Sequence, residues 1–311
     1  MKIGFVFPGQ GSQCVGMGKD LFTHFAEARA VFEAADDALG EKLSRLCFEG
    51  PEETLTLTAN TQPAILTVSV AAQAVFGKRG PAPAFAAGHS LGEYSALVVT
   101  GSLGLGAAVR AVRERGRFMQ EAVPPGVGAM AAVLGLPAER VQQVCKQVAD
   151  GRVLEPANYN SPDQTVIAGH AEAVHSAAKP LQQAGAKRVI PLQVSAPFHC
   201  ALMQPVKPLL QGVLGRIDFA APRCPVVTNV EARPNGDPSR TPTLLLQQVS
   251  RPVRWVECVQ EMQRQGVTHF VELGPGRVLR GLIRHISKDA QVFGVEDSES
   301  LKKALDGVAS A

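Results

Sequence analysis

The sequence predicts an α/β fold with a parallel sheet and a second, smaller α/β unit inserted into it. Short apolar runs at 2–7 and 85–88 are each followed by helix-like segments, and another such run comes late, at 268–274. Between them, from 126 to 194, the pattern changes to strand, helix, strand, strand, helix, strand. A parallel core interrupted by a ferredoxin-like insertion explains all three observations.

The first part of the chain alternates strands and helices. KIGFVF at 2–7 is typical of a buried strand and leads into the turn-rich loop PGQGSQ, after which 18–39 carries helical periodicity. A long apolar helix is expected from Asn60, which would act as its cap, with a proline near its start. FAAG then forms a strand, and LGEYSALVV forms a helix that Gly101 ends.

The insertion at 126–194 contains six expected elements. We place the rest of the chain, 1–125 and 195–311, in the main core, to which the chain returns with the strand THFVELG at 268–274. The six elements, in chain order, are 129–135, 137–150, 153–160, 164–170, 172–185 and 187–194, with helices at the second and fifth places.

Composition excludes several classes of function. The chain has 311 residues, of which 45% are hydrophobic, and its net charge of +3 comes without a basic tract, which argues against nucleic-acid binding. No apolar stretch is long enough to span a bilayer, and MKIGFVFPGQGSQ is too short and too glycine-rich for a signal peptide. We expect a globular protein without membrane attachment.

Six cysteines are spread along the chain without a CxxC pair. This usage indicates reduced thiols in a cytoplasmic setting, with no disulfide and no structural metal.

The segment GHSLG places Ser90 between two glycines, after a strand and before a helix. This is the pattern of a nucleophile elbow, in which Gly88 and Gly92 allow a sharp turn that exposes the serine hydroxyl. The same five residues also occur by chance in many proteins, so the motif alone leaves both interpretations open.

A nucleophilic serine needs a base, and His199 is the best placed of the seven histidines. It follows the last strand of the insertion in VSAPFHCAL, where Pro197 breaks the pattern and the loop can bring the ring back over the main core. His89 is adjacent to Ser90, and neighbours on a tight turn point apart. A purely structural role for His199 stays open at this stage.

The helix expected at 104–123 carries one charge on its apolar side. Turning each residue by about 100° gathers the other charges on one polar face, whereas Arg115 falls in the middle of the apolar stripe. A guanidinium turned inward is costly to bury and requires an anion or a hydrated cavity. Its partner is either a protein carboxylate such as Glu93 or an anionic group of a substrate, which Arg can bind in a bidentate manner.

The loop PGQGSQ has glycines on both sides of Gln10, which let backbone N–H groups approach a ligand closely. It has neither the GxGxxG spacing of a dinucleotide site nor the GK[ST] ending of a Walker loop. A turn without a ligand is the alternative.

Five spaced motifs, FPGQGSQ, GHSLGEYSAL, RGRFMQEAV, SAPFH and QVSRPVRW, resemble those of the malonyl-CoA:acyl carrier protein transacylase family. The resemblance runs from about residue 3 to about 285. It implies an α/β-hydrolase-like large subdomain and a ferredoxin-like small one, in agreement with the periodicity.

The resemblance also implies the roles of individual residues. Ser90 would be the nucleophile and His199 the base of a ping-pong transfer of malonyl from coenzyme A to the phosphopantetheine thiol of acyl carrier protein, in fatty acid synthesis. The backbone N–H groups of Gln10 and Leu91 would form the oxyanion hole, and Arg115 would bind the free malonyl carboxylate. The substrates are then a coenzyme A thioester and acyl carrier protein, no cofactor is needed, and the protein is a monomer.

Three further positions follow from the resemblance. The backbone carbonyl of Gln248 would orient His199, and Asn160 would line the cleft. Phe198 departs from many stand-alone members, which have serine directly before the histidine, and it narrows the pocket in favour of malonyl. From the residues alone, a serine hydrolase and a non-catalytic protein that holds an acyl carrier remain alternatives.

Overall fold

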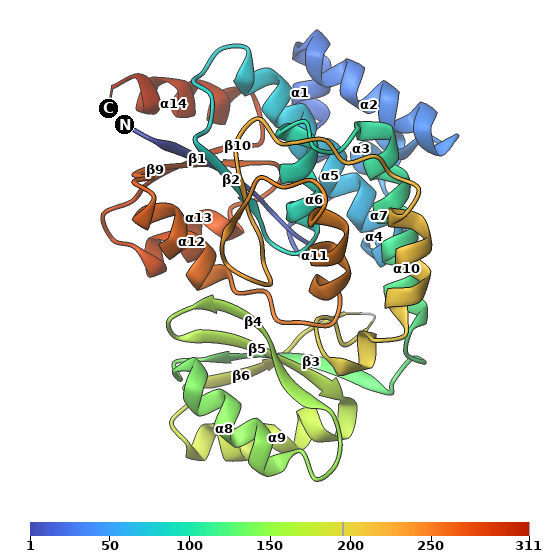
Figure 1. Ribbon diagram of the computed structural model, residues 1–311, viewed down its shortest axis with the longest axis vertical. Coiled ribbons are helices and arrows are strands. Elements are labelled where there is room, and N and C mark those ends of the chain that lie inside the picture. Colours follow the sequence, from blue (N-terminus) through green and yellow to red (C-terminus); the bar gives the residue numbers. More distant parts are fainter. Residues whose placement is uncertain (195, 311) are drawn as a thin grey trace.

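The computed structural model describes residues 1–194 and 196–310, so position 195, where the predicted return to the main core and the SAPFH motif begin, lies outside the described residues. A six-stranded sheet, called the large sheet below, has the order β10-β9-β1-β2-β7-β8 and is parallel except for β8 (Figure 1). Its strands are β1 (Ile3–Phe7), β2 (Phe85–Gly88), β7 (Val226–Val227), β8 (Pro234–Asn235), β9 (His269–Leu273) and β10 (Gln291–Val295).

Helices cover both faces of the large sheet. Strand side chains alternate between faces, so Phe5 and Phe7 of β1 join one apolar core while Val6 joins another. The described helices outside the inserted unit are α1 (Lys19–His24), α2 (Ala26–Leu39), α3 (Leu43–Glu49), α4 (Glu52–Thr56), α5 (Thr58–Gly77), α6 (Leu91–Val99), α7 (Leu105–Glu121), α10 (Val206–Leu214), α11 (Thr241–Gln248), α12 (Trp255–Arg264), α13 (Val278–Ile286) and α14 (Ser298–Ala309).

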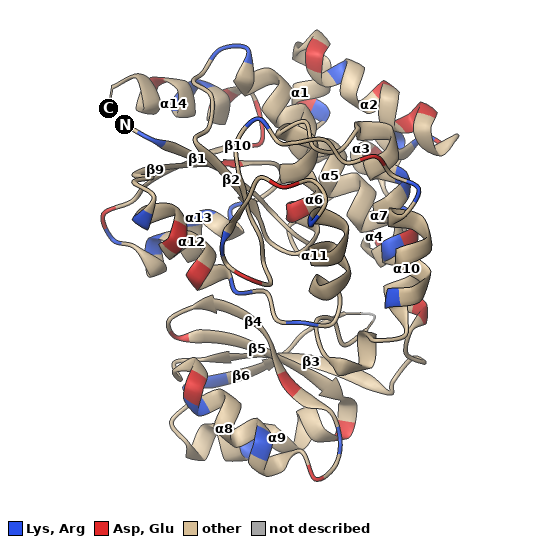
Figure 2. Cartoon of the chain, in the orientation of Figure 1, with Lys and Arg blue, Asp and Glu red and all other residues tan. Residues whose placement is uncertain are grey.

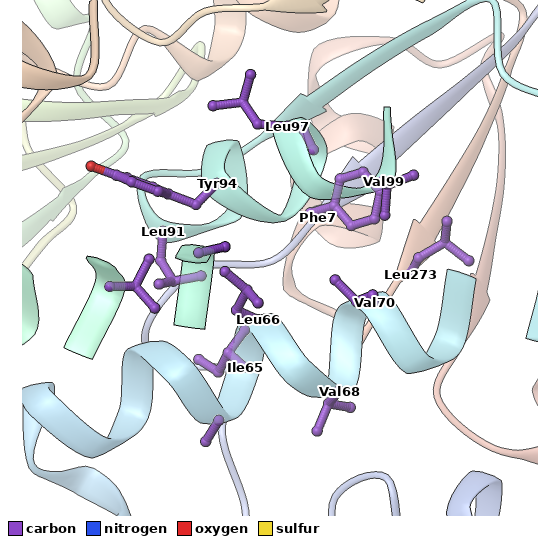
Figure 3. Close-up of a cluster of buried hydrophobic side chains, with 14 of the residues drawn as sticks. Phe7, Ile65, Leu66, Val68, Val70, Leu91, Tyr94, Leu97, Val99 and Leu273 are labelled. Carbon is purple, nitrogen blue, oxygen red and sulfur yellow. The ribbon is translucent and has the colours of Figure 1, made fainter. Parts of the chain in front are cut away.

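Helix α5 lies inside the larger of these cores and is apolar on nearly every side, which is typical of a helix buried all round. Figure 3 shows its Leu66 and Val70 in one cluster with Phe7 of β1, Leu91 of α6 and Leu273 of β9. The helix therefore holds the start of α6 against the central strands.

A second, four-stranded antiparallel sheet, called the small sheet, has the order β4-β5-β3-β6. It forms the lower layer of Figure 1, with two helices on its outer face. The parallel sheet and the separate antiparallel one confirm the predicted fold class, whereas the division after 125 and after 194 stays a prediction. The elements of this unit are β3 (Gly128–Leu134), α8 (Ala138–Val148), β4 (Leu154–Ser161), β5 (Gln164–His170), α9 (Ala171–Gln183) and β6 (Arg188–Pro191).

The two sheets share one apolar core. On β3, Ala131 and Val133 face α8 and α9, but Met130 and Ala132 belong to the same cluster as Phe5 of the large sheet. Two backbone hydrogen bonds also join the layers on either side of Val253, which donates to the Ala157 carbonyl at 2.9 Å and whose carbonyl accepts from Tyr159 at 2.9 Å.

Three expected elements differ from the structure. The helical stretch at 18–39 is two helices, because Phe25 between α1 and α2 is extended. The strand expected at 187–194 ends at Pro191. Asn60 is not a cap: α5 begins two residues earlier, where the Thr58 N–H donates to Gln120 Oε1 of α7 at 3.0 Å. A side chain of a distant helix therefore accepts the hydrogen bond from the helix start that the sequence assigns to a local cap residue.

Figure 2 shows Lys and Arg mixed with Asp and Glu on outer helices such as α12, and few charges in the large sheet. No helix in the described part of the chain is long and apolar enough to cross a membrane.

Two helical glycines provide a test of how closely α6 packs on β1. A Cβ at Gly92 of α6 would overlap the Phe7 carbonyl oxygen, whereas a Cβ at Gly212 of α10 would meet open space. We expect Gly92→Ala to lower the free energy of unfolding by about 1 to 3 kcal/mol. Gly212→Ala should raise it by about 0.5 to 1 kcal/mol, through helix propensity alone. Urea unfolding of both variants measures the difference, and two changes of the same sign would contradict the packing argument.

Candidate active site

Ser90 sits in the turn between β2 and α6, with a backbone φ of 51° and ψ of −105°. This conformation is strained for a residue with a side chain and is characteristic of a functional turn. The two glycines have a different task from the predicted one, because neither has a positive φ. A Cβ at Gly88 would overlap the backbone of Gly92, so both are needed for close packing beneath the serine.

Asn229 holds this turn in place. Its Oδ1 accepts from the Ser90 N–H at 2.7 Å, its Nδ2 donates to the Gly88 carbonyl at 2.7 Å, and its own N–H donates to Glu93 Oε2 at 3.0 Å. The Ser90 N–H is therefore already used and is not available to a ligand. Asn229 belongs to no motif in the sequence, and only the fold brings it to Ser90.

The structure brings Ser90 and His199 together. The Ser90 Oγ lies 2.7 Å from His199 Nε2, and His199 Nδ1 lies 2.8 Å from the backbone carbonyl of Gln248. A carbonyl only accepts, so the proton sits on Nδ1 and leaves Nε2 free to accept from the serine hydroxyl. His199 itself has a φ of 60°, so this imidazole, like the Ser90 hydroxyl that it faces, is carried by a strained backbone.

Burial, and after it the positive charge of Arg115, lower the pKa of His199 to about 3. The imidazole is therefore neutral at pH 7, as a group that accepts a proton must be.

Arg115 is buried, as predicted, with 1% of its surface exposed. Its Nη2 donates to Ser90 Oγ at 3.1 Å and to Gln248 Oε1 at 2.8 Å, and its Nη1 donates to Gln62 Oε1 at 2.7 Å. The guanidinium also lies over the ring of Tyr94, 5.4 Å from its centre. Within the described residues, no carboxylate oxygen lies within ion-pair distance of this cation.

Glu93, the alternative partner of Arg115, is buried but does not pair with it directly. The Gln248 amide lies between them: its oxygen accepts from Arg115, and its nitrogen donates to Glu93 Oε2 at 2.8 Å. Burial raises the pKa of Glu93 to about 7, so this carboxyl is partly protonated at neutral pH. It does not neutralise the cation.

These groups surround a cavity of about 100 Å³, which adjoins a larger hollow of about 560 Å³ through Gln10, Leu192 and Val194. Asn160 lines the larger hollow. The small cavity can hold a small acyl group, and the larger hollow can hold a longer group to which that acyl group is attached. Of the residues expected at the site, those that line the small cavity are Gln10, Ser90, Leu91, Arg115, Phe198 and His199.

The residues that line this cavity without having been predicted include His89 and Gln62. His89 does not point away from the site but lines it, and its Nε2 lies 2.8 Å from Asn160 Oδ1 of the small sheet. Gln62 lines it from α5. The sequence held only a weak signal for Gln62, because it is one of several polar residues in the largely apolar helix α5. Among the described residues, no group of three His, Cys, Asp or Glu side chains could hold a metal ion.

A serine hydroxyl hydrogen-bonded to a neutral imidazole on a strand–turn–helix elbow defines an enzyme class that works through an acyl-serine. The comparisons agree with this class. The chain belongs to the acyl transferase family, because the model of the acyl transferase domain matches residues 4–301.

Relatives and a solved structure narrow the assignment within this family. The chain is 46% identical to the malonyl CoA-acyl carrier protein transacylase of Bacillus subtilis, over 98% of this chain and 96% of the relative. It is 47% identical to the Escherichia coli protein of the same name, over 98% and 99%. A solved malonyl-transacylase in complex with a type II polyketide acyl-carrier protein superposes with a TM-score of 0.96 at 47% identity, over 99% of this chain and 100% of that one.

Glu93 gives a testable dependence of stability on pH. Its pKa is about 7 in the folded protein and about 4.3 in an unfolded chain, so unfolding releases a proton between these values and stability falls as the pH rises through this window. Glu93→Gln keeps one oxygen for both hydrogen bonds but cannot titrate. We expect the loss of unfolding free energy between pH 4.5 and 7.5 to be smaller in the variant, by up to about 3 kcal/mol. Denaturant unfolding at several pH values measures this, and parallel pH profiles for the two proteins would contradict it.

Proposed function

We propose that the chain transfers a malonyl group from malonyl-CoA to the phosphopantetheine thiol of acyl carrier protein through a malonyl ester of Ser90. One observation carries the proposal: a buried cation with only neutral acceptors lies 3.1 Å from a serine hydroxyl that is hydrogen-bonded to a neutral histidine. The names of the relatives, and of the neighbour solved with a carrier protein, support the same substrates.

In the first half-reaction, Ser90 Oγ attacks the thioester carbonyl of malonyl-CoA while His199 Nε2 takes the hydroxyl proton. The carbon–sulfur bond then breaks, the malonyl ester forms on Ser90, and the proton passes from His199 to the departing sulfur of coenzyme A. The Gln248 carbonyl supports this step because it stabilises the charged imidazolium through Nδ1. No carboxylate is required in that position.

In the second half-reaction, the thiol of the carrier arm replaces coenzyme A. His199 takes the thiol proton, the sulfur attacks the ester carbonyl, and the Ser90 oxygen leaves with the proton returned to it. Nucleophile, base and anion-binding groups all come from the chain, so the reaction needs no cofactor.

Gln10 and Leu91 both line the cavity beside Ser90, and we assign the oxyanion hole to their backbone N–H groups. The Ser90 N–H is used by Asn229, which leaves this task to other amides. The N-terminus of α6 adds a favourable dipole. Each N–H donor of an oxyanion hole stabilises the transition state by about 2.7 to 4 kcal/mol.

The free malonyl carboxylate pairs with Arg115 in this proposal, and Phe198 limits the width of the pocket beside it. An acetyl group would fill the same space but leave the buried cation without an anion. A charged hydrogen bond is worth roughly 1.5 to 3 kcal/mol, which is the size of the preference to expect.

The covalent intermediate can be tested with radiolabelled malonyl-CoA. The wild-type protein should become labelled and lose its label when the phosphopantetheinylated carrier protein is added. Ser90→Ala should not label, and its transfer rate should fall at least about 10⁴-fold, because the acyl acceptor is missing. Label on a folded Ser90→Ala protein would remove Ser90 from its role, and release of free malonate in place of transfer would indicate a hydrolase.

The carboxylate site can be tested through substrate preference. Arg115→Ala should lower the ratio of malonyl to acetyl transfer by about 10- to 100-fold, because only malonyl loses a charged partner. The measurement is kcat/KM for both thioesters with the same carrier protein, on protein shown to be folded. An unchanged ratio would return Arg115 to a structural role.

A further inference from the structure

Arg115 is held from two sides by carboxamide oxygens. Gln62 of α5 accepts from Nη1 at 2.7 Å, and Gln248 at the end of α11 accepts from Nη2 at 2.8 Å. All three side chains are at most 1% exposed, so water does not screen a charge placed among them.

The Gln62 amide has a defined orientation. Its nitrogen lies 3.8 Å from the sulfur of Met119, one turn along α7 from Arg115, and its oxygen faces the guanidinium. A sulfur atom is a weak acceptor, whereas a cation strongly prefers the oxygen. The amide therefore positions the guanidinium beside Ser90 through a hydrogen bond whose acceptor carries no net charge.

The other groups near Arg115 do not supply a full negative charge. Tyr94 of α6 presents its ring, and burial raises its pKa to about 12, so it stays neutral. His199 is neutral, and Glu93 of α6 is partly protonated and separated from the cation by Gln248. The Arg115 Nε also has no hydrogen-bond acceptor in the part of the chain that the structure describes. The site holds a cation with unused bonding capacity.

We propose that Gln62 is a specificity-determining residue: it fixes the Arg115 guanidinium at Ser90 with a neutral oxygen, so that the positive charge stays available to the carboxylate of the acyl group. This inference rests on the proposed function. It makes Gln62 a positioning residue that acts through Arg115.

The proposal makes the charge of Gln62, and not its size, the decisive property. A glutamate has the same length and offers an oxygen at the same place, but it would pair with Arg115 permanently. The substrate carboxylate would then meet a neutralised partner and a nearby anion. Malonyl transfer should suffer more than acetyl transfer, which needs no cation.

The experiment compares Gln62→Glu with wild type in kcat/KM for malonyl-CoA and acetyl-CoA, with the phosphopantetheinylated carrier protein as acceptor. We expect the ratio of malonyl to acetyl transfer to fall by about 10- to 100-fold, the effect of losing a charged hydrogen bond. Thermal unfolding checks that the variant is folded. If it is not, Gln62→Asp provides the same test with a shorter acid.

Two variants serve as controls. Gln62→Met removes the oxygen without adding charge, so Arg115 loses one positioning hydrogen bond but keeps its positive charge. The ratio of malonyl to acetyl transfer should therefore fall by less than about threefold, far less than in Gln62→Glu. Gln73→Glu introduces the same acid on the same helix, about 16 Å further along its axis, and should change neither rate. A Gln62→Glu ratio within threefold of wild type, or equal to that of Gln62→Met, would overturn the proposal.

Arg115→Ala separates this inference from the proposed function. If Arg115→Ala abolishes the malonyl preference and Gln62→Glu does not, the role of Gln62 is wrong and that of Arg115 stands. If neither variant changes the preference, the carboxylate site itself is wrong.

Discussion

The buried guanidinium of Arg115 is the interaction on which the rest of the site depends. A charge taken out of water is costly unless nearby dipoles replace the lost solvent, and here they come from the side chains of Gln62, Gln248 and Ser90. The three acceptors belong to α5, to α11 and to the elbow before α6, which are far apart in the sequence. Solvating one cation therefore requires that α5, α11 and the elbow be correctly packed around α7.

Gln248 connects the parts of this arrangement more directly than any other described residue. Its backbone carbonyl orients His199, its side-chain oxygen accepts from Arg115, and its amide nitrogen donates to the Ser90 carbonyl at 3.0 Å and to Glu93 at 2.8 Å. One residue thus sets the tautomer of the base, the place of the cation and the geometry of the turn that carries the hydroxyl. A displacement of α11 would change all three together, and this coupling makes the site rigid.

The sequence predicted both sheets and most of the residues that meet at the candidate site, because these leave local signals. Ser90 lies in a glycine-flanked turn, and Arg115 interrupts an apolar stripe. The features that the sequence did not predict depend on contacts between residues far apart in the chain. Gln120 of α7 caps α5 across a sequence separation of 62 residues, and Asn229 reaches the elbow from the loop that follows β7, so neither contact has a local pattern. Gln62 shows the intermediate case, since its polarity was visible but its partner was not.

The apolar core shared by Met130 of the small sheet and Phe5 of the large one has a consequence for how substrates travel. Hinge opening between the two layers would expose this common interior to water, and the backbone bonds at Val253 would break as well. Wide separation of the two layers is therefore energetically costly. The thioester of coenzyme A and the thiol arm of the carrier must instead enter through an already formed slot, so a slender, unbranched tether suits the entrance better than a bulky one.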